Sequence, residues 1–233
     1  MQNAMEYARA AFFTPGGLGE AQLEQVFSRL MTRDTTLADL YFQSARYEAW
    51  GLEEGIVKSG SYSIEQGVGV RSVCGEQTGF AYSDEISLEA LLDSAQAASA
   101  ISRSGQSGRV KTWTTHEPVR HLYGVDDPLS SLNEADKISL LQRIDAKARA
   151  LSPHVQQVMA NMVAVHEIIL IVDEQGRMTA DVRPLVRTNV SVIVERDGRT
   201  ESAMAGGGGR FDLAYFLQDE RAEQYAEEAV RMA

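Results

Sequence analysis

Cysteine and long apolar runs are both scarce in this sequence. Its 233 residues include a single cysteine, Cys74, which excludes an internal disulfide. No stretch approaches the roughly 20 consecutive apolar residues of a membrane-spanning helix. Residues Met1 to Phe13 lack the basic start and continuous apolar run of a signal peptide. We therefore expect a cytoplasmic protein with no membrane partner.

Basic residues are in the minority. Lysine and arginine total 22 against 33 aspartates and glutamates, so the net charge is −11 and the pI is about 4.9. The basic residues are scattered singly, and no local patch offsets the repulsion between an acidic protein and a phosphate backbone. This charge pattern argues against a nucleic-acid partner.

Hydrophobic periodicity in the first half of the chain indicates both helices and strands. A helical pattern at Glu20–Met31 follows Pro15 and is expected to be a small, loosely attached element. A second helical pattern runs from an N-cap at Ser87 to about Arg103. Between them lie short β segments whose brief connections predict antiparallel pairing. These segments are Leu37–Phe42, Gly55–Lys58, Gly67–Val73 and Thr78–Tyr82.

The second half repeats this alternation with longer elements. The clearest strand is Val186–Glu195, in which valines alternate with polar residues. This alternation predicts a sheet with one buried face. Asp197-Gly198, just after this strand, predicts a type I′ hairpin. A helix that is still in phase at Ala233 follows, and we expect that this helix is truncated. The expected elements are a helix from an Asn133 cap to Leu151, strands at Val163–Val172, Arg177–Val182 and Val186–Glu195, and a helix from about Asp219.

These patterns predict an α+β chain of two successive units, each a mainly antiparallel sheet with helices packed on it. The Ser/Gly-rich stretch at 102–108 is typical of a connector. The expected organisation is an N-terminal helical extension at 1–35, a first subdomain at 36–104, a connector at 105–131 and a second subdomain at 132–233.

His166-Glu167 is a candidate metal motif, because His-Glu opens the helical motif of zinc peptidases. That motif requires a second histidine one helical turn later, where this chain has Leu170 and Ile171. The local pattern is also that of a strand. The favoured interpretation is a strand histidine whose ring is satisfied or faces solvent.

The remaining metal-binding and nucleophilic side chains are isolated. His116, Glu117 and His121 lie close in sequence but lack the three or four ligands of a tetrahedral site, so a surface loop is favoured. Cys74 has no recognisable catalytic context, and a small apolar role is favoured. We therefore expect no metal site, no cofactor and no catalytic residue in this chain.

The run Gly206-Gly207-Gly208-Gly209-Arg210 is the most unusual local feature. It lacks the Lys-Ser/Thr that completes a phosphate loop, which argues against a nucleotide site. Two interpretations remain. The favoured one is a hinge between a strand and a helix. The other is an exposed backbone that captures an extended peptide through main-chain hydrogen bonds, and it makes these residues candidates for substrate binding.

Several segments, in register from about Leu37 to the last residue, carry a family resemblance. They are Asp39–Ser44, Gly60–Tyr62, Gln66–Arg71, Thr78–Tyr82, Asp181–Arg187, Gly206–Phe211 and Glu228–Ala233. Together they resemble the TldD branch of the TldD/PmbA metallopeptidase family. The resemblance implies a bacterial, cytosolic, zinc-dependent peptidase that acts on small, unfolded or modified peptides and pairs a TldD-type subunit with a TldE/PmbA-type subunit.

The resemblance also implies a metal site of the form His-Glu-x-x-x-His, with a later cysteine, in a C-terminal domain. This sequence contains no such motif, so no catalytic residue is carried over to it, and neither Cys74 nor His166-Glu167 corresponds to that site. Zinc is therefore expected in the parent enzyme and not in this chain.

We accordingly expect the N-terminal region of a TldD-like zinc metallopeptidase, inactive on its own, with Gly206 to Arg210 in its peptide cleft. The expected partners are an unfolded peptide and either a TldE/PmbA-type subunit or a second copy of the chain. The alternative is a complete, non-catalytic peptide-binding or scaffolding protein of the same architecture.

Overall fold

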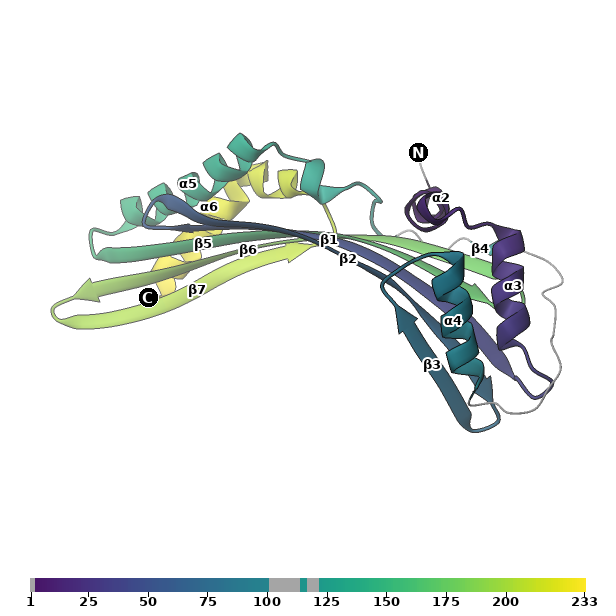
Figure 1. Ribbon diagram of the computed structural model, residues 1–233. Helices are drawn as coiled ribbons and strands as arrows, with labels where there is room; N and C mark the ends of the chain where they lie inside the picture. Colours follow the sequence, from purple (N-terminus) through teal and green to yellow (C-terminus); the bar gives the residue numbers. More distant parts are fainter. Residues whose placement is uncertain (1–2, 101–113, 117–121) are drawn as a thin grey trace. The chain divides into compact units, whose positions relative to one another are not determined.

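The structure, a computed structural model, describes residues 3–100, 114–116 and 122–233. It is an α+β protein, as predicted, with a mixed seven-stranded sheet (Figure 1). The chain forms two compact units, each assembled from three segments. Unit 1 comprises Met1–Ala45, Ile64–Val125 and Glu167–Val182, and unit 2 comprises Arg46–Ser63, Asp126–His166 and Arg183–Ala233.

The strands are longer than the sequence predicts, and four of them contribute residues to both units. Gly51, the Ser59-Gly60 pair and Pro184 each fall in a gap between predicted strand segments. In the structure they lie inside β-strands, which run on through these gaps. The strands are β1 (Leu37–Glu53), β2 (Ile56–Cys74), β3 (Gln77–Ser83), β4 (Thr114–His116), β5 (Val155–Asp173), β6 (Arg177–Arg196) and β7 (Arg199–Gly209).

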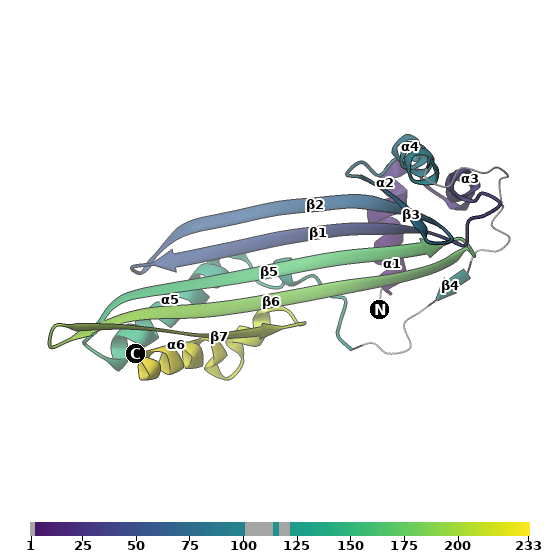
Figure 2. The same cartoon turned by 90° about the horizontal axis from the view of Figure 1, so that it is seen from below.

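The sheet has the hydrogen-bonded order β3-β2-β1-β5-β6-β4, and β7 pairs with β6 (Figure 2). The β2–β3 and β6–β7 pairs are antiparallel, as predicted, while the short β4 runs parallel to β6. Asp197 and Gly198 have φ values of 52° and 76°. Positive φ at both positions is what a type I′ turn requires, which confirms the predicted hairpin.

Helices cover one face of the sheet in unit 1. They are α1 (Ala4–Ala8), the π-helix η1 (Arg9–Phe13), α2 (Thr14–Gly16), α3 (Glu20–Leu30) and α4 (Leu88–Ser99). The apolar side chains of α3 are fully buried in a core that includes Phe42 of β1, and the rings of Phe12 and Phe13 lie 5.6 and 6.1 Å from the Phe42 ring. The expectation that α3 is loosely attached is therefore wrong, because its apolar stripe is packed against the sheet.

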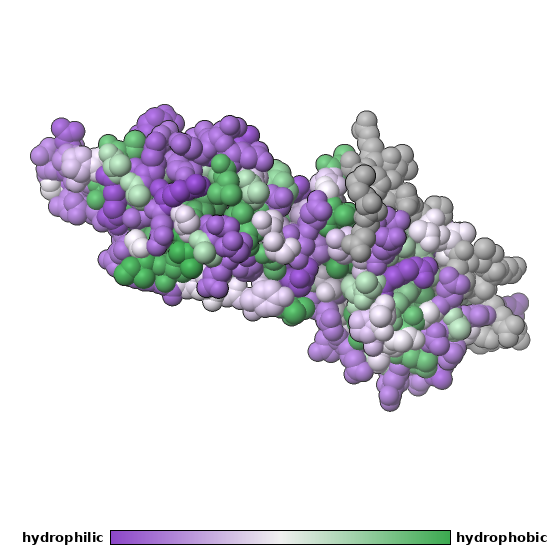
Figure 3. All heavy atoms as spheres, turned by 90° about the horizontal axis from the view of Figure 1, so that it is seen from above, coloured by the Kyte–Doolittle hydropathy of each residue, from purple (hydrophilic) through white to green (hydrophobic). Residues whose placement is uncertain are grey.

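Unit 2 has its own core beneath two helices, α5 (Glu134–Leu151) and α6 (Arg221–Met232), with the short 3-10 helices η2 (Pro128–Ser130) and η3 (Leu213–Glu220) beside them. The predicted caps are confirmed, since Asn133 accepts from the Asp136 amide at 2.9 Å and Ser87 of unit 1 caps α4. Ion pairs Arg143–Glu223 and Lys147–Glu227 join α5 to α6. Figure 3 shows hydrophilic residues predominating on the helical side of this unit, with apolar patches between them.

Two sequence expectations reach beyond what the structure describes. The connector at 102–108 lies outside the described residues, and the subdomain boundaries at 36–104 and 132–233 stay predictions.

The last helix begins at Arg221, after a kink at which Asp219 and Glu220 both have positive φ, 51° and 52°. Among the described residues, no helix is long and apolar enough to cross a membrane.

Candidate functional site

The glycine run forms the end of strand β7. Gly206, Gly207, Gly208 and Gly209 pair in register with Asn189, Thr188, Arg187 and Val186 of β6. The favoured interpretation as a hinge is therefore wrong, because the antiparallel ladder extends through all four glycines. No other strand among the described residues pairs with β7, so its second edge carries backbone groups without a strand partner.

Close approaches explain why glycine occupies these positions. A β-carbon at Gly208 would lie 2.0 Å from the Val186 carbonyl oxygen, and one at Gly206 would lie 2.4 Å from the Thr188 carbonyl oxygen. On Gly207 it would meet the Tyr225 hydroxyl at 2.3 Å, and on Gly209 the Phe211 ring at 2.4 Å. The strand thus presents backbone where any other residue would force the neighbouring β6 backbone or aromatic rings to move.

Polar side chains surround this strand. Arg187 Nε donates to Asn189 Oδ1 at 2.9 Å, and Asn189 Nδ2 donates to Asn161 Oδ1 of β5 at 3.0 Å. The exposed Arg210 donates from Nη1 to the Pro184 carbonyl at 3.5 Å. Beside the bare backbone of β7, the sheet therefore carries amide groups and a guanidinium that can form hydrogen bonds with a polar main chain.

An aromatic cluster supports the glycine run from the helical side. The Phe211 and Tyr215 rings stack at 3.8 Å, and the Arg221 guanidinium lies 4.3 Å from the centre of the Tyr215 ring. Burial raises the pKa of the Tyr225 hydroxyl, and Tyr215 raises it further, while the charges of Arg221 and Arg187 act in the opposite direction. The neutral phenol, rather than phenolate, is thus the form that the fold favours above Gly207.

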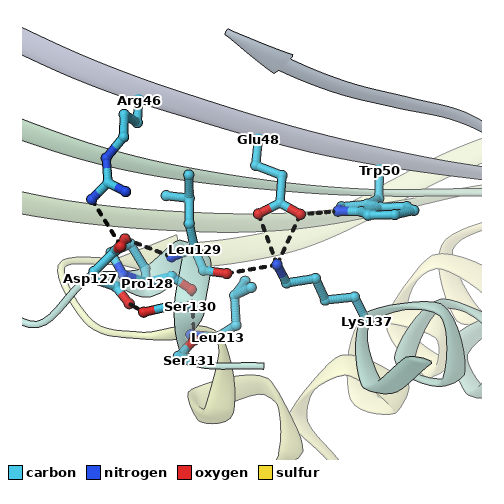
Figure 4. A network of polar contacts seen from close by, with 10 residues as sticks. All are labelled: Arg46, Glu48, Trp50, Asp127, Pro128, Leu129, Ser130, Ser131, Lys137 and Leu213. Atoms are coloured by element: carbon cyan, nitrogen blue, oxygen red, sulfur yellow. Dashed lines mark hydrogen bonds and ion pairs between the residues drawn. The ribbon is translucent and has the colours of Figure 1, made fainter. Parts of the chain in front are cut away.

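A buried polar network anchors α5 and η2 to strand β1 in unit 2 (Figure 4). Lys137 forms an ion pair with Glu48, which also accepts from the Trp50 indole at 2.5 Å. Arg46 forms an ion pair with Asp127 at 2.9 Å. These charged groups are engaged with one another, which is the pattern of a structural network rather than of an open catalytic site.

His166 and Glu167 lie in strand β5, as predicted, and their side chains have separate partners. The His166 ring is 1% exposed, and its Nδ1 lies 3.0 Å from an Arg46 guanidinium nitrogen. Glu167 accepts from Gln43 Nε2 at 2.5 Å. A cationic guanidinium thus lies beside the imidazole, and the side chains of two adjacent strand residues point to opposite faces of the sheet. His166 and Glu167 therefore do not form a zinc ligand set.

The other candidate ligands are not brought together by the described residues. Cys74 is half-buried at the end of β2, with its Sγ 3.5 Å from the Thr35 hydroxyl. His116 is the last residue of β4, and Glu117 and His121 lie outside the described residues. Within the described ranges, no group of three or more His, Cys, Asp and Glu side chains is placed to hold a metal ion.

A pocket on the open sheet face of unit 1 was not anticipated from the sequence. It has a volume of about 320 Å³ and lies between aromatic rings and two buried glycines. Its lining is Tyr41, Gln43, Ala45, Glu65, Gln66, Gly67, Gly69, Phe80 and Tyr82. The alternation of Phe80 and Tyr82 in β3 was a usable signal, but only the register of β2 against β3 places those rings beside Gly67 and Gly69.

Comparison with known proteins gives two family matches along the chain. Residues 38–102 match PmbA/TldA metallopeptidase domain 1, and residues 127–233 match the PmbA/TldA metallopeptidase central domain. The metalloprotease TldD homologue of Haemophilus influenzae is 42% identical over 94% of this chain and 47% of its own length. That of Buchnera aphidicola from Schizaphis graminum is 40% identical over 90% and 45%. The chain thus spans about half the length of these curated relatives.

Solved structures share the fold at low sequence identity. A candidate modulator of DNA gyrase from Thermotoga maritima has a TM-score of 0.72 at 14% identity, covering 91% of this chain and 47% of its own. TldE from Thermococcus kodakarensis has a TM-score of 0.63 at 12% identity, covering 98% and 47%. At these low identities the solved structures show a shared fold only. The family matches and the curated relatives show which family the chain belongs to. The chain therefore belongs to the PmbA/TldD metallopeptidase family, of which it carries the first and central domains.

Proposed function

We propose that this chain is the peptide-guiding part of a metallopeptidase that hydrolyses small, unfolded or modified peptides in the cytoplasm. The metal and the catalytic residues of the whole protein would lie outside these 233 residues, and the chain alone would be inactive. Family membership and the names of the curated relatives, metalloprotease TldD homologues, support the reaction class.

Edge strand β7 is the observation that carries the peptide-guiding role. Its glycine run leaves main-chain groups accessible on one edge, and an extended peptide can add to such an edge through main-chain hydrogen bonds. This mode is tolerant of peptide sequence, because the hydrogen bonds do not involve the peptide's side chains. It also rejects folded proteins, whose strands are already paired. We assign Gly206, Gly207, Gly208, Gly209 and Arg210 to this edge.

The metal of the whole protein is proposed to be zinc. The described residues of this chain do not fit such an ion, since His166 faces Arg46 and Glu167 is engaged by Gln43. We derive no step of the hydrolysis from them. A related subunit of the TldE/PmbA type, or a second copy of the chain, is proposed as the partner, and the fold shared with a TldE structure supports this pairing.

Peptide binding can be tested with the 233-residue chain and an unstructured 12-residue synthetic peptide, using isothermal titration calorimetry. A version scrambled in sequence is expected to bind with similar affinity. A version N-methylated at alternate residues is expected to lose at least about ten-fold, because methylation removes the donors that pair with a strand edge. Equal binding of the methylated peptide, or no binding of any version, would contradict the β7 assignment.

The inactivity of the chain alone is tested by metal analysis and by cleavage of the same peptide. After purification without added metal, we expect less than stoichiometric zinc and no cleavage products by mass spectrometry. Tightly bound zinc together with chelator-sensitive cleavage would place catalysis within these residues. If the full-length protein also cleaves no peptide, the alternative of a non-catalytic peptide-binding protein is favoured.

A further inference from the structure

The pocket of unit 1 is lined by aromatic rings that are strongly exposed for their size. Phe80 and Tyr82 of β3 are each 63% exposed, and Tyr41 of β1 is 38% exposed. All three belong to the sheet face opposite the helical core, where a soluble protein ordinarily places polar side chains. Three large rings around one hollow are therefore a feature that folding of unit 1 does not require.

Glycines shape the floor of this hollow. A β-carbon at Gly67 would lie within 2.4 to 2.7 Å of the Tyr82 ring and hydroxyl, and one at Gly69 would lie 3.1 Å from the Phe80 ring. The Tyr82 hydroxyl also donates to the Gln66 carbonyl at 3.2 Å, which fixes the orientation of that ring. The rings thus lean over backbone that has no side chains, and the space between them stays open.

The charge of the pocket is negative. Glu65 lines it and has no hydrogen-bond or ion-pair partner among the described residues. The cation nearest along the same face of β2, Arg71, is bound to Asp39, and the chain as a whole carries a net charge of −11. An anionic occupant would be repelled here, whereas a cation would gain both a carboxylate partner and the faces of aromatic rings.

We propose that this pocket binds the basic side chain, lysine or arginine, of an unfolded peptide. The aliphatic stem would lie along the exposed rings and the charged head would reach Glu65. The volume, about 320 Å³, is at the small end of ligand pockets and suits one long side chain rather than a larger molecule. That the side chain comes from a peptide rests on the proposed function, while the preference for a cation rests on the pocket alone.

The pocket is tested first with single amino-acid probes and nuclear magnetic resonance of the 233-residue chain. N-acetyl-lysine methylamide is expected to shift the ring signals of Phe80 and Tyr82. N-acetyl-norleucine methylamide has the same four-carbon stem without the charge, and we expect it to bind about three- to ten-fold more weakly. Equal shifts from both probes would overturn the cation preference. If the ring signals shift with protein concentration alone, a second copy of the chain occupies the pocket. This result would also overturn the proposal that the pocket binds a basic side chain of a peptide.

Substitutions locate the binding to this pocket. Glu65→Gln is expected to remove most of the preference for lysine over norleucine, and Phe80→Leu to weaken the binding of the lysine probe. Two variants serve as controls and should leave the binding of the lysine probe unchanged. Glu76→Gln removes the same charge from an exposed turn, and Tyr62→Leu removes an exposed ring of β2 that does not line the pocket. A preference that survives Glu65→Gln would refute the assignment of Glu65.

Peptides then separate this inference from the proposed function. Replacing one lysine of the 12-residue peptide by norleucine should weaken its binding by the same factor as in the single-residue probes. If peptides bind and this replacement has no effect, the pocket assignment fails and the proposed function stands. If the lysine probe binds and no peptide does, the cation site stands, while the proposed function and the peptide origin of the side chain fail.

Discussion

Lys137 Nζ lies 2.9 and 2.8 Å from the two carboxylate oxygens of Glu48, and the two side chains are only 6% and 14% exposed. Lys137 also donates to the Leu129 carbonyl at 2.7 Å, within η2, the short helix that precedes α5. The pair thus fastens helix α5 to strand β1. A charge this deeply buried is tolerated only while its partner is present, because alone it would be uncompensated.

Replacing Lys137 by methionine is expected to lower the free energy of unfolding by about 3–5 kcal/mol, since Glu48 is then left buried without its partner. The double variant Lys137→Met, Glu48→Gln should recover part of this loss. Urea denaturation of the 233-residue chain measures both. Lys147→Met on the same helix is the control, because the exposed Lys147–Glu227 pair is worth only about 0–1 kcal/mol. Equal losses at positions 137 and 147 would show that burial of the pair has no energetic consequence.

Alanine at Gly208 should destabilise the chain by about 1–3 kcal/mol, the usual range for overpacking. The added methyl would fall 2.0 Å from the Val186 carbonyl, and backbone cannot rotate away as a side chain can. Hydrogen exchange of the β6 and β7 amides should rise in step with the loss of stability. Ser202→Ala, at an exposed position of the same strand, is the matched control. Unchanged exchange in the Gly208 variant would mean that the two strands accommodate a side chain there.

Local patterns predicted most elements of this fold because their causes are local. The Ser87 and Asn133 caps, the alternating valines of β6 and the Asp197-Gly198 turn each act over a few residues, and all are found where predicted. Strand length is underestimated because the predicted segments stop on either side of Gly51 and Pro184, two residue types that usually weaken a strand. Gly51 lies within β1, and Pro184 lies between the parts of β6 that pair with β4 and with β7, so it interrupts neither ladder.

The candidate sites depend on register, which the sequence does not disclose. The glycine run was singled out, but its favoured interpretation as a hinge failed, since only the pairing of Gly208 with Arg187 shows an ordered edge strand. The pocket of unit 1 was missed altogether. Its rings and glycines come from β1, β2 and β3, and the pairing of Gly69 with Tyr82 is needed to bring them together.

The cap of α5 offers a smaller and independent test. Asn133→Ala should cost about 1 kcal/mol, because the Asp136 amide loses its acceptor at the start of the helix. Asn133→Asp should restore the cap, since aspartate accepts the same hydrogen bond and its charge suits a helix N-terminus. Thermal unfolding followed by circular dichroism compares the three proteins. An alanine variant as stable as the native chain, or an aspartate variant no better than alanine, would contradict the assigned role of the cap.

The raised pKa of Tyr225 predicts a loss of stability in alkaline solution. Burial favours the neutral phenol in the folded chain, so the folded pKa lies above the ordinary value of 10.0. The resulting stabilisation is complete below about pH 10 and is lost as the pH rises through the folded pKa, because the unfolded chain releases this proton first. In Tyr225→Phe this component is absent. The stability difference between the native chain and the variant should therefore shrink or reverse between about pH 9 and about pH 11.

Urea midpoints at both pH values measure this difference, and tyrosinate absorbance gives a second readout. The native chain should contain a component that ionises late, which Tyr225→Phe removes and Tyr62→Phe, at an exposed position, retains. Since the phenol lies against Gly207, its ionisation would place a charge beside the glycine strand. The affinity of a β7-bound peptide should then change over the same pH interval in the native chain and stay constant in Tyr225→Phe. A pH dependence common to both would assign the change to other groups.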